Sequence, residues 1–273
     1  MTLPGLKNCS DGGADWNLPV RLNMAAQCLA QSKDQIAIID LTAGARRDVS
    51  FSVLSQMVDG LARALNARVK PGDRVGVLLG QSPWCAAAHL AIWKIGAISV
   101  PLFKLFQHAA LASRITDAGV DIVLTDSEGC GLLGDLADAW LVDAVGVAGG
   151  PVAYADTGPD DPAVLIYTSG TTGSPKGALH GHRVLSGHLP GVSISHDHLG
   201  QSGDCLWTPA DWAWIGGLFD VAMPALALGV PVVAARFDKF SPQACVEVIR
   251  RGNVRNVFFP PTALRMLRAD GAA

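Results

Sequence analysis

Short apolar runs alternate with helical patterns along the first half of the chain. The helical pattern is clearest in residues 51–65, where apolar side chains recur at three- and four-residue spacing and predict a helix with one buried face. Four short apolar runs predict strands, at residues 36–40, 74–79, 98–100 and 121–125. Such alternation of strands and helices predicts a mostly parallel sheet with helices on its faces.

Two further helices are expected between these strands, and one of them has clear boundary signals. Ser82 can cap the free amide groups of a first turn, and Pro83 suits the first helical position. This helix is expected to run to about Ile95, where Gly96 can end it. The other helix is expected over residues 109–118.

The second half of the chain continues the pattern after an irregular stretch. Residues 126–162 contain one weak strand candidate, at 141–147, and residues 163–167 are a candidate for a buried strand. From about residue 185 the alternation resumes, with strands expected at 205–208, 230–234 and 254–259 and helices at 215–226, 242–250 and 261–267. The sequence therefore predicts an α/β fold of two mostly parallel sheets flanked by helices. The second sheet is expected to be incomplete.

The composition favours a large apolar core. Of the 273 residues, 49% are apolar and only 16% are charged, whereas average soluble domains carry about 25% charged residues. This excludes intrinsic disorder. The net charge of −3 gives no overall electrostatic footprint for nucleic acid or an anionic membrane. Nucleic acid is therefore not an expected partner, and any phosphate chemistry must be local.

No segment predicts export or a membrane span. The first residues lack a basic start followed by an apolar run, so a secretory signal is not expected. The apolar stretch 217–235 is interrupted by Asp220 and Pro224, and it fits a buried helix, a turn and a strand better than a transmembrane helix. The six cysteines are widely spread and form no Cys-x-x-Cys pair. We therefore expect free thiols and a cytoplasmic location.

The most informative segment runs from Tyr167 to Gly177 and reads YTSGTTGSPKG. Its glycines let several backbone amides point into one concavity that suits phosphate oxygens, its hydroxyls can donate hydrogen bonds or meet Mg²⁺, and its lysine adds a positive charge. No Asp or Glu lies between Pro162 and His196, so a triphosphate would meet no fixed anion there. The segment predicts a phosphate-binding loop whose candidate residues are Thr168, Ser169, Gly170, Thr171, Thr172, Gly173 and Lys176.

Two other interpretations of this segment fit less well. A flexible Ser/Gly/Thr linker requires neither the preceding strand nor the Pro-Lys-Gly ending. An ordinary P-loop requires Gly-Lys-Ser/Thr, whereas here Lys176 follows Pro175 and precedes Gly177. A P-loop kinase or GTPase is therefore not expected.

The same segment closely resembles the signature of the adenylate-forming superfamily, which includes acyl-CoA synthetases, luciferases and peptide-synthetase adenylation domains. It matches the family pattern over eleven consecutive positions. Residues 70–75, residues 96–102 and the segment Trp207–Gly217, which reads WTPADWAWIGG, also look like acyl-CoA synthetases. The resemblance covers roughly residues 30–268 and is closer in character to fatty or short-chain acyl-CoA synthetases than to amino-acid-activating domains.

The resemblance implies a two-step reaction with ATP, Mg²⁺ and coenzyme A. A carboxylate would attack the α-phosphate of ATP to give an acyl-adenylate and pyrophosphate, and coenzyme A would then take the acyl group. The loop would hold the β- and γ-phosphates, with Lys176 and Thr172 as candidate catalytic residues. Catalysis would consist mostly of positioning and charge stabilisation, because the substrate's own carboxylate is the nucleophile.

The tryptophan-rich segment is the candidate substrate pocket. On an extended segment Trp212 and Trp214 would face the same side and form a flat apolar wall, and Gly216 and Gly217 would leave room for an acyl tail. The alternative is that these aromatic side chains simply fill the core between the sheets. Asp211 is expected either to order the loop by bonding nearby amides or to contact substrate.

Five of the seven histidines lie between residues 180 and 198. Two His-x-His pairs without a clear third ligand are weak evidence for zinc, so no metal-ligating residues are predicted. We expect these histidines near the ATP phosphates, with His180 or His182 contacting the nucleotide or capping the helix that begins there.

The resemblance also suggests how the chain is divided. Residues 1–30 are expected to be an N-terminal extension, residues 31–184 a first α/β subdomain that ends in the phosphate loop, and residues 185–273 the start of a truncated second subdomain. Complete family members are longer and carry adenine, ribose and adenylation-lysine elements that are not found in this sequence. Two hypotheses therefore stay open: the N-terminal region of an acyl-CoA synthetase, or a catalytically incomplete fragment or binding subunit that needs a complementing chain or self-association. A phosphate-binding hydrolase unrelated to adenylation is a third, weaker alternative.

Overall fold

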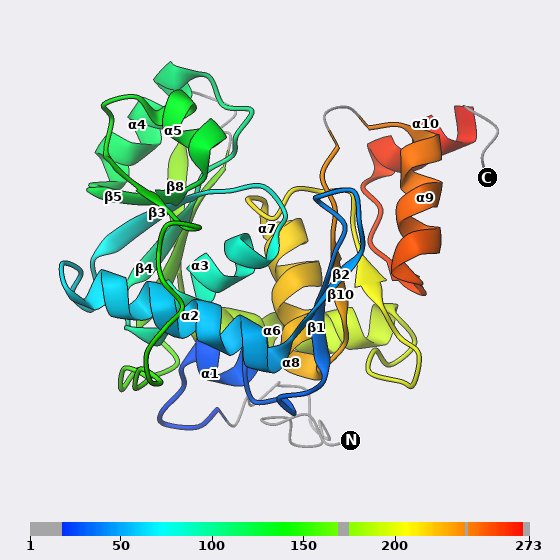
Figure 1. Cartoon of the computed structure of the whole chain (residues 1–273), viewed down its shortest axis with the longest axis horizontal. Coiled ribbons are helices and arrows are strands. Elements are labelled where there is room, and N and C mark those ends of the chain that lie inside the picture. Colours follow the sequence, from blue (N-terminus) through cyan, green and yellow to red (C-terminus); the bar gives the residue numbers. More distant parts are fainter. Residues whose placement is uncertain (1–17, 169–174, 238–239, 270–273) are drawn as a thin grey trace, which may run out of the picture.

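The computed structural model describes residues 18–168, 175–237 and 240–269. They form two sheets with a layer of helices between them and further helices on each outer face (Figure 1). The predicted fold class, α/β with two mostly parallel sheets flanked by helices, is confirmed.

The six-stranded sheet has the order β6-β5-β3-β4-β7-β8. Its members are β3 (Arg74–Leu78), β4 (Ile98–Pro101), β5 (Ile122–Thr125), β6 (Asp138–Leu141), β7 (Pro162–Thr168) and β8 (Lys176–Gly181). All neighbouring strands are parallel except β7 and β8, which form an antiparallel hairpin. The prediction of a strand at 141–147 is wrong, because β6 ends at Leu141. Strand β8 was not predicted from the sequence.

The five-stranded sheet has the order β11-β9-β10-β1-β2. Its members are β1 (Ile36–Asp40), β2 (Arg47–Ser50), β9 (Leu206–Trp207), β10 (Val232–Ala234) and β11 (Asn256–Val257). β1 pairs in parallel with β10, with Ile38 opposite Val232. The expected division at residues 184 and 185 therefore does not follow the sheets, because β1 and β2 belong to the second sheet despite their early place in the chain.

The helices form a central layer and two outer layers. The central layer contains α1 (Met24–Cys28), α2 (Phe51–Asn66), α3 (Pro83–Lys94), α6 (Arg183–Ser195) and α8 (Met223–Leu228). Ahead of α8 lie the short helix α7 (Ile215–Gly217) and a π-helical turn, η1 (Leu218–Ala222). The outer helices are α4 (His108–Ala118) and α5 (Ser127–Leu133) on the first sheet, and α9 (Pro242–Gly252) and α10 (Pro261–Ala269) beside the second.

Helix α3 carries apolar residues on every side because almost all of its residues are buried. It begins as the sequence predicts, with the Ser82 hydroxyl accepting a hydrogen bond from the amide of Cys85 at 3.1 Å. Near its end Trp93 is fully buried, and its indole Nε1 donates to the Ala163 carbonyl at 2.8 Å. This bond ties the central helix layer to β7, the strand that leads into the phosphate-loop segment.

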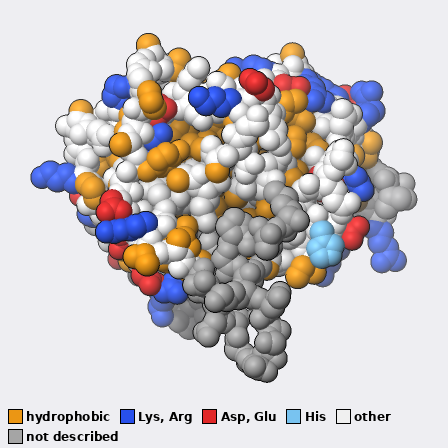
Figure 2. Space-filling model, turned by 90° about the horizontal axis from the view of Figure 1, so that it is seen from below, with side chains coloured by type: hydrophobic (Ala, Val, Ile, Leu, Met, Phe, Trp, Pro, Cys, Tyr) orange, Lys and Arg blue, Asp and Glu red, His pale blue; other side chains and the backbone are white. Residues whose placement is uncertain are grey.

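The underside of the molecule is seen in Figure 2, where hydrophobic side chains show through the middle of the face and Lys and Arg side chains lie mostly around its periphery. Across the described parts of the chain, no helix is long and apolar enough to span a bilayer. The stretch 217–235 instead forms buried α8, a turn at Gly229 and buried β10, as predicted.

Helix α1 is part of the core and not an extension. Met24, Ala25 and Cys28 are fully buried, which corrects the assignment of residues 18–30 to an N-terminal extension. The Met24 amide donates a hydrogen bond to Nδ1 of His182 at 3.1 Å, and the His182 side chain is itself fully buried. His182 therefore joins α1 to the start of α6 and makes no capping hydrogen bond. The expectation that its side chain caps the helix is wrong.

Acidification should destabilise the fold through His182. Burial lowers the pKa of this imidazole from 6.5 to about 4. Between these values the unfolded chain binds more protons, so the free energy of unfolding should fall as pH falls, by an amount on the order of 3 kcal/mol from this residue. Denaturant unfolding of the unaltered chain and of His182→Asn across this window measures the difference. Equal pH dependence in the two proteins would contradict the assignment.

Candidate active site

The structure places the two flanks of the predicted phosphate loop opposite each other. Thr168 ends β7, Lys176 begins β8, and the two residues are register partners in the antiparallel hairpin. Both are exposed. Ser169, Gly170, Thr171, Thr172 and Gly173 lie outside the described residues. The hairpin register thus brings one hydroxyl and one ammonium group to the two ends of the loop.

This loop leaves the sheet at the edge where ligands of open α/β sheets bind. Because β3, β4, β5 and β7 are parallel, their carboxyl ends share one edge. Gln81 follows β3 there, and its side-chain amide donates to the Thr208 carbonyl of the second sheet's β9 segment at 3.0 Å. Thr168 therefore lies at the sheet edge that faces the junction of the two sheets.

Charged side chains are paired at the same edge. Lys104, after β4, lies 2.7 Å from Asp126 Oδ1, after β5, and Arg236 Nη2 lies 3.5 Å from Asp126 Oδ2. Burial acts to raise the pKa of Asp126, but hydrogen bonds from Lys104 and the Gly129 amide outweigh it and hold this pKa below its usual value. The carboxylate is thus held ionised between two cations.

Tyr167 anchors the end of β7 to helix α4. Its hydroxyl donates a hydrogen bond to Asp117 Oδ2 at 2.5 Å, and burial, followed by the Asp117 carboxylate, raises the pKa of the phenol. The Arg114 guanidinium lies 4.0 Å from the Phe106 ring centroid and 5.9 Å from that of Tyr167. These contacts fix the end of β7, from which the predicted phosphate loop begins.

Trp212 and Trp214 do not face the same side. Trp212 is fully buried in the main core, whereas Trp214 is 39% exposed and packs its ring 5.4 Å from Phe103 and 6.2 Å from Phe106. The prediction of a shared wall is wrong because residues 211–214 form a turn and not an extended segment. Trp214 therefore belongs to an aromatic group with Phe103 and Phe106. Arg114, which contacts both Phe106 and Tyr167, connects this group to the end of β7.

Asp211 orders this turn. Its Oδ1 accepts a hydrogen bond from the Ala213 amide at 2.7 Å, which is one of the two roles that the sequence left open. Burial raises the pKa of Asp211, partly offset by that hydrogen bond.

The two glycines that follow differ in their surroundings. A Cβ at Gly217 would collide with the carbonyl group of Asp211 and lie 3.2 Å from Cα of Trp212, so this glycine permits backbone contact and leaves no room for an acyl tail, contrary to expectation. A Cβ at Gly216 would instead lie 3.4 Å from the Phe258 ring and 3.7 Å from Asp220 Oδ2. Gly216 therefore borders the space beside those two side chains.

Gly217→Ala should destabilise the protein. Because the clash is with backbone, the change should lower the free energy of unfolding by about 1–3 kcal/mol, as overpacking does. The matched control is Gly131→Ala in α5, where a Cβ would meet nothing within 4 Å and the better helix propensity of alanine should stabilise by up to about 1 kcal/mol. Chemical denaturation measures both, and equal effects of the two variants would contradict the packing assigned to Gly217.

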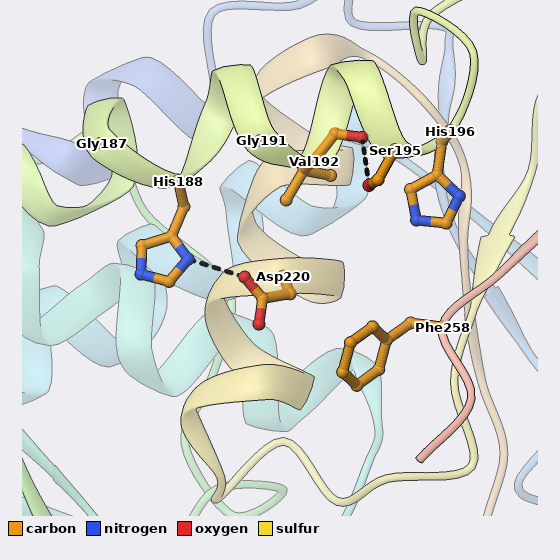
Figure 3. A pocket seen from close by; sticks show the side chains of 8 residues that line it. All are labelled: Gly187, His188, Gly191, Val192, Ser195, His196, Asp220 and Phe258. Atoms are coloured by element: carbon orange, nitrogen blue, oxygen red, sulfur yellow. Dashed lines mark hydrogen bonds and ion pairs between the residues drawn. The ribbon is translucent and has the colours of Figure 1, made fainter. Parts of the chain in front are cut away.

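A groove of about 360 Å³ lies next to Gly216. Its wall residues include Gly187, His188, Gly191, His196, Asp220 and Phe258. Figure 3 shows His188 reaching from α6 and His196 from the residue that follows this helix, with Asp220 of η1 and Phe258 on the opposite side. His188 Nδ1 lies 2.7 Å from Asp220 Oδ1. The volume falls within the usual range for small-molecule sites.

Sequence reasoning assigned neither Asp220 nor Phe258 to a site, and it placed His188 with the other histidines near the ATP phosphates and not in a groove. The available signal was the spacing of Gly187 and Gly191, which places two residues without side chains four apart on one helix face beside His188. A Cβ at either glycine would meet nothing within 4 Å. The groove is open because α6 lacks side chains there.

We next consider side chains that could bind a metal ion. No cluster of three His, Cys, Asp or Glu side chains in the part of the chain that the structure describes is arranged to hold one. His180 is half-buried, and burial lowers the pKa of its imidazole, with a further contribution from His188.

Comparison with known proteins assigns the chain to a family. The model of the AMP-binding enzyme family matches residues 25–273, so the chain belongs to this family. The match includes both sheets and the hairpin that carries Thr168 and Lys176.

The similar proteins include acetyl-coenzyme A synthetases and an acyl-CoA synthetase. Acetyl-coenzyme A synthetase 1 of Pseudomonas aeruginosa is 29% identical over 95% of this chain and 46% of its own length. An acetyl-coenzyme A synthetase of Alkalilimnicola ehrlichii is 31% identical over 92% of this chain and 45% of its own. The crystal structure of an acyl-CoA synthetase from Brucella canis superposes with a TM-score of 0.82 at 26% identity and covers 93% of this chain and 50% of that one. The chain thus spans about half the length of these relatives.

Proposed function

We propose that this chain is the N-terminal region of an AMP-forming acyl-CoA synthetase, which activates a carboxylic acid with ATP and transfers it to coenzyme A. The observation that carries the proposal is the hairpin of β7 and β8, which pairs Thr168 with Lys176, the second and tenth positions of an eleven-position family signature. The family match and the acetyl-CoA synthetase relatives support it.

The first chemical step would join the acid to AMP. A carboxylate oxygen attacks the α-phosphorus of ATP, the bond to the bridging oxygen of the β-phosphate breaks, and pyrophosphate leaves with the electron pair. Lys176 and the hydroxyls and amides of residues 168–174 would hold the β- and γ-phosphates, with Thr172 among them. Mg²⁺ would supply charge neutralisation on the phosphates when bound with ATP. Positioning and charge stabilisation are the protein's contribution.

The second step would form the thioester. The thiolate sulfur of coenzyme A attacks the acyl carbon, the acyl–oxygen bond breaks, and AMP leaves. The acid in both steps would lie beside Trp214 and Gly216. Trp214 packs against Phe103 and Phe106, and Gly216 borders the groove, so residues 214–216 lie between the aromatic group and the groove. Trp212 would support this segment from within the core.

A second candidate role rests on the length comparison. In this role the chain would be an ATP- and acid-binding subunit that requires a complementing chain for turnover, and the match to only about half the length of its relatives supports it. Both roles fit a cytoplasmic location, where ATP and coenzyme A are supplied and where the described cysteines, all free thiols, would stay reduced.

Exchange of labelled pyrophosphate into ATP tests the proposal. The 273-residue chain is incubated with Mg·ATP, labelled pyrophosphate and a series of carboxylic acids. Exchange that depends on the acid would support the synthetase assignment for this chain alone. Binding of Mg·ATP without exchange would favour the subunit role. Hydrolysis of ATP without any acid, or no binding of Mg·ATP, would contradict both.

A further inference from the structure

The groove beside Gly216 combines apolar and polar walls. Val192 and Phe258 contribute apolar surface, and the open positions at Gly187 and Gly191 leave space between them. Against this surface stand His188 and Asp220, the two partners of a 2.7 Å hydrogen bond. An alkyl chain alone could not form a hydrogen bond with either member of this pair.

Asp220 has one carboxylate oxygen committed and one available. Its Oδ1 meets His188 Nδ1, whereas Oδ2 has no hydrogen-bond partner among the described residues and lies 3.7 Å from the Cβ position of Gly216. Figure 3 shows this second oxygen directed away from His188. The available acceptor therefore faces the space next to the proposed acid segment.

His188 sets the orientation of that acceptor. The imidazole also packs 5.8 Å from the Phe219 ring, and Asp220 and Phe219 are neighbours in η1. With the imidazole held against the ring and bonded to Oδ1, the carboxylate cannot turn both oxygens away from the groove. His188 is thus a positioning residue for Asp220.

An alkyl tail alone is a poor occupant of such a site. It would remove water from the Asp220 carboxylate and offer no donor in return, and a buried acceptor left without a partner is unfavourable. A tail that ends in a hydroxyl or ammonium group replaces the lost water hydrogen bond. A site built to hydrogen-bond one substrate group discriminates strongly against the analogue that lacks it.

We propose that the groove takes the far end of the acid substrate and that Asp220 accepts a hydrogen bond from a hydroxyl or ammonium group there. The preferred substrate class is thus a carboxylic acid with a second, hydrogen-bond-donating group, and not a plain alkanoic acid. This inference rests on the proposed function, because it assumes that the acid lies beside Trp214 and Gly216.

Calorimetric titration of the 273-residue chain with matched acids in the presence of Mg·ATP tests it. Straight-chain alkanoic acids are compared with the ω-hydroxy and ω-amino acids of the same length. The best donor-bearing acid should bind at least about tenfold more tightly than its alkanoic counterpart. Asp220→Leu should abolish that preference. Asp220→Asn separates the two donor classes, because it should remove a preference for ammonium but retain part of one for hydroxyl.

The matched control is Glu247→Gln on α9, which removes one exposed carboxylate that pairs with Arg250 outside the groove. It should leave every affinity unchanged. Equal or tighter binding of alkanoic acids to the unaltered chain, or a preference that survives in Asp220→Leu, would overturn the inference alone. Failure of every acid to bind would contradict the proposed function and with it this inference.

Discussion

Asp59→Ala is expected to lower the free energy of unfolding by about 3–5 kcal/mol, the cost typical of leaving a buried charge without its partner. Lys94 Nζ lies 2.6 Å from Asp59 Oδ1, and the Lys94 side chain is only 4% exposed. The same carboxylate oxygen accepts a hydrogen bond from the Val152 amide at 2.9 Å. Without Asp59, both the ammonium group and this amide lose their partner.

The double variant separates charge burial from packing. Adding Lys94→Met to Asp59→Ala removes the unpaired ammonium, so the double variant should be more stable than Asp59→Ala alone. The remaining loss includes the contact of Lys94 with the Tyr154 ring, whose centroid lies 4.3 Å from Nζ. Denaturant unfolding measures all three proteins. A loss below about 1 kcal/mol for Asp59→Ala, which is typical of an exposed pair, would contradict the buried ion pair.

Lys176→Ala should weaken the binding of Mg·ATP by about 10- to 100-fold. A hydrogen bond to a charged group contributes about 1.5–3 kcal/mol, and every 1.4 kcal/mol is a factor of ten in affinity. Lys176 begins β8 directly opposite Thr168, and its exposed side chain is therefore available to the phosphates. Isothermal titration calorimetry with Mg·ATP measures the change.

Lys33→Ala is the control for this variant, because Lys33 is also exposed and lies ahead of β1 in the second sheet. It removes the same charge and should leave the affinity within about twofold, since screening weakens the long-range effect of one exposed charge. An equal loss in the two variants would mean that Lys176 acts only through net charge and would contradict its role at the phosphates.

Much of the fold could be predicted because its local signals are strong. Helix α3 has its Ser82 cap and Pro83 start in the sequence, and α2 has a regular apolar face. The place of β1 could not be predicted, because its pairing with β10 joins residues nearly two hundred positions apart and no local pattern encodes it. β8 was missed because its residues are mostly exposed and carry no alternating apolar pattern.

In the candidate site, too, contiguous residues could be predicted from the sequence, whereas contacts between distant residues could not. The predicted phosphate segment is contiguous, so candidate residues could be named from the sequence, and its flanks Thr168 and Lys176 are paired in the hairpin. The substrate region depends on distant contacts. Trp214 meets Phe103 across more than a hundred residues, and Gly216 faces Phe258, so the partners of these two residues could not be inferred from local spacing.

We propose above all that the segment between β7 and β8 binds the β- and γ-phosphates of ATP. Calorimetric titration of the unaltered 273-residue chain with Mg·ATP, Mg·pyrophosphate and AMP tests it most directly. We expect Mg·ATP to bind more tightly than AMP and Mg·pyrophosphate to compete with Mg·ATP. Equal affinity for ATP and AMP, or no competition by pyrophosphate, would contradict it.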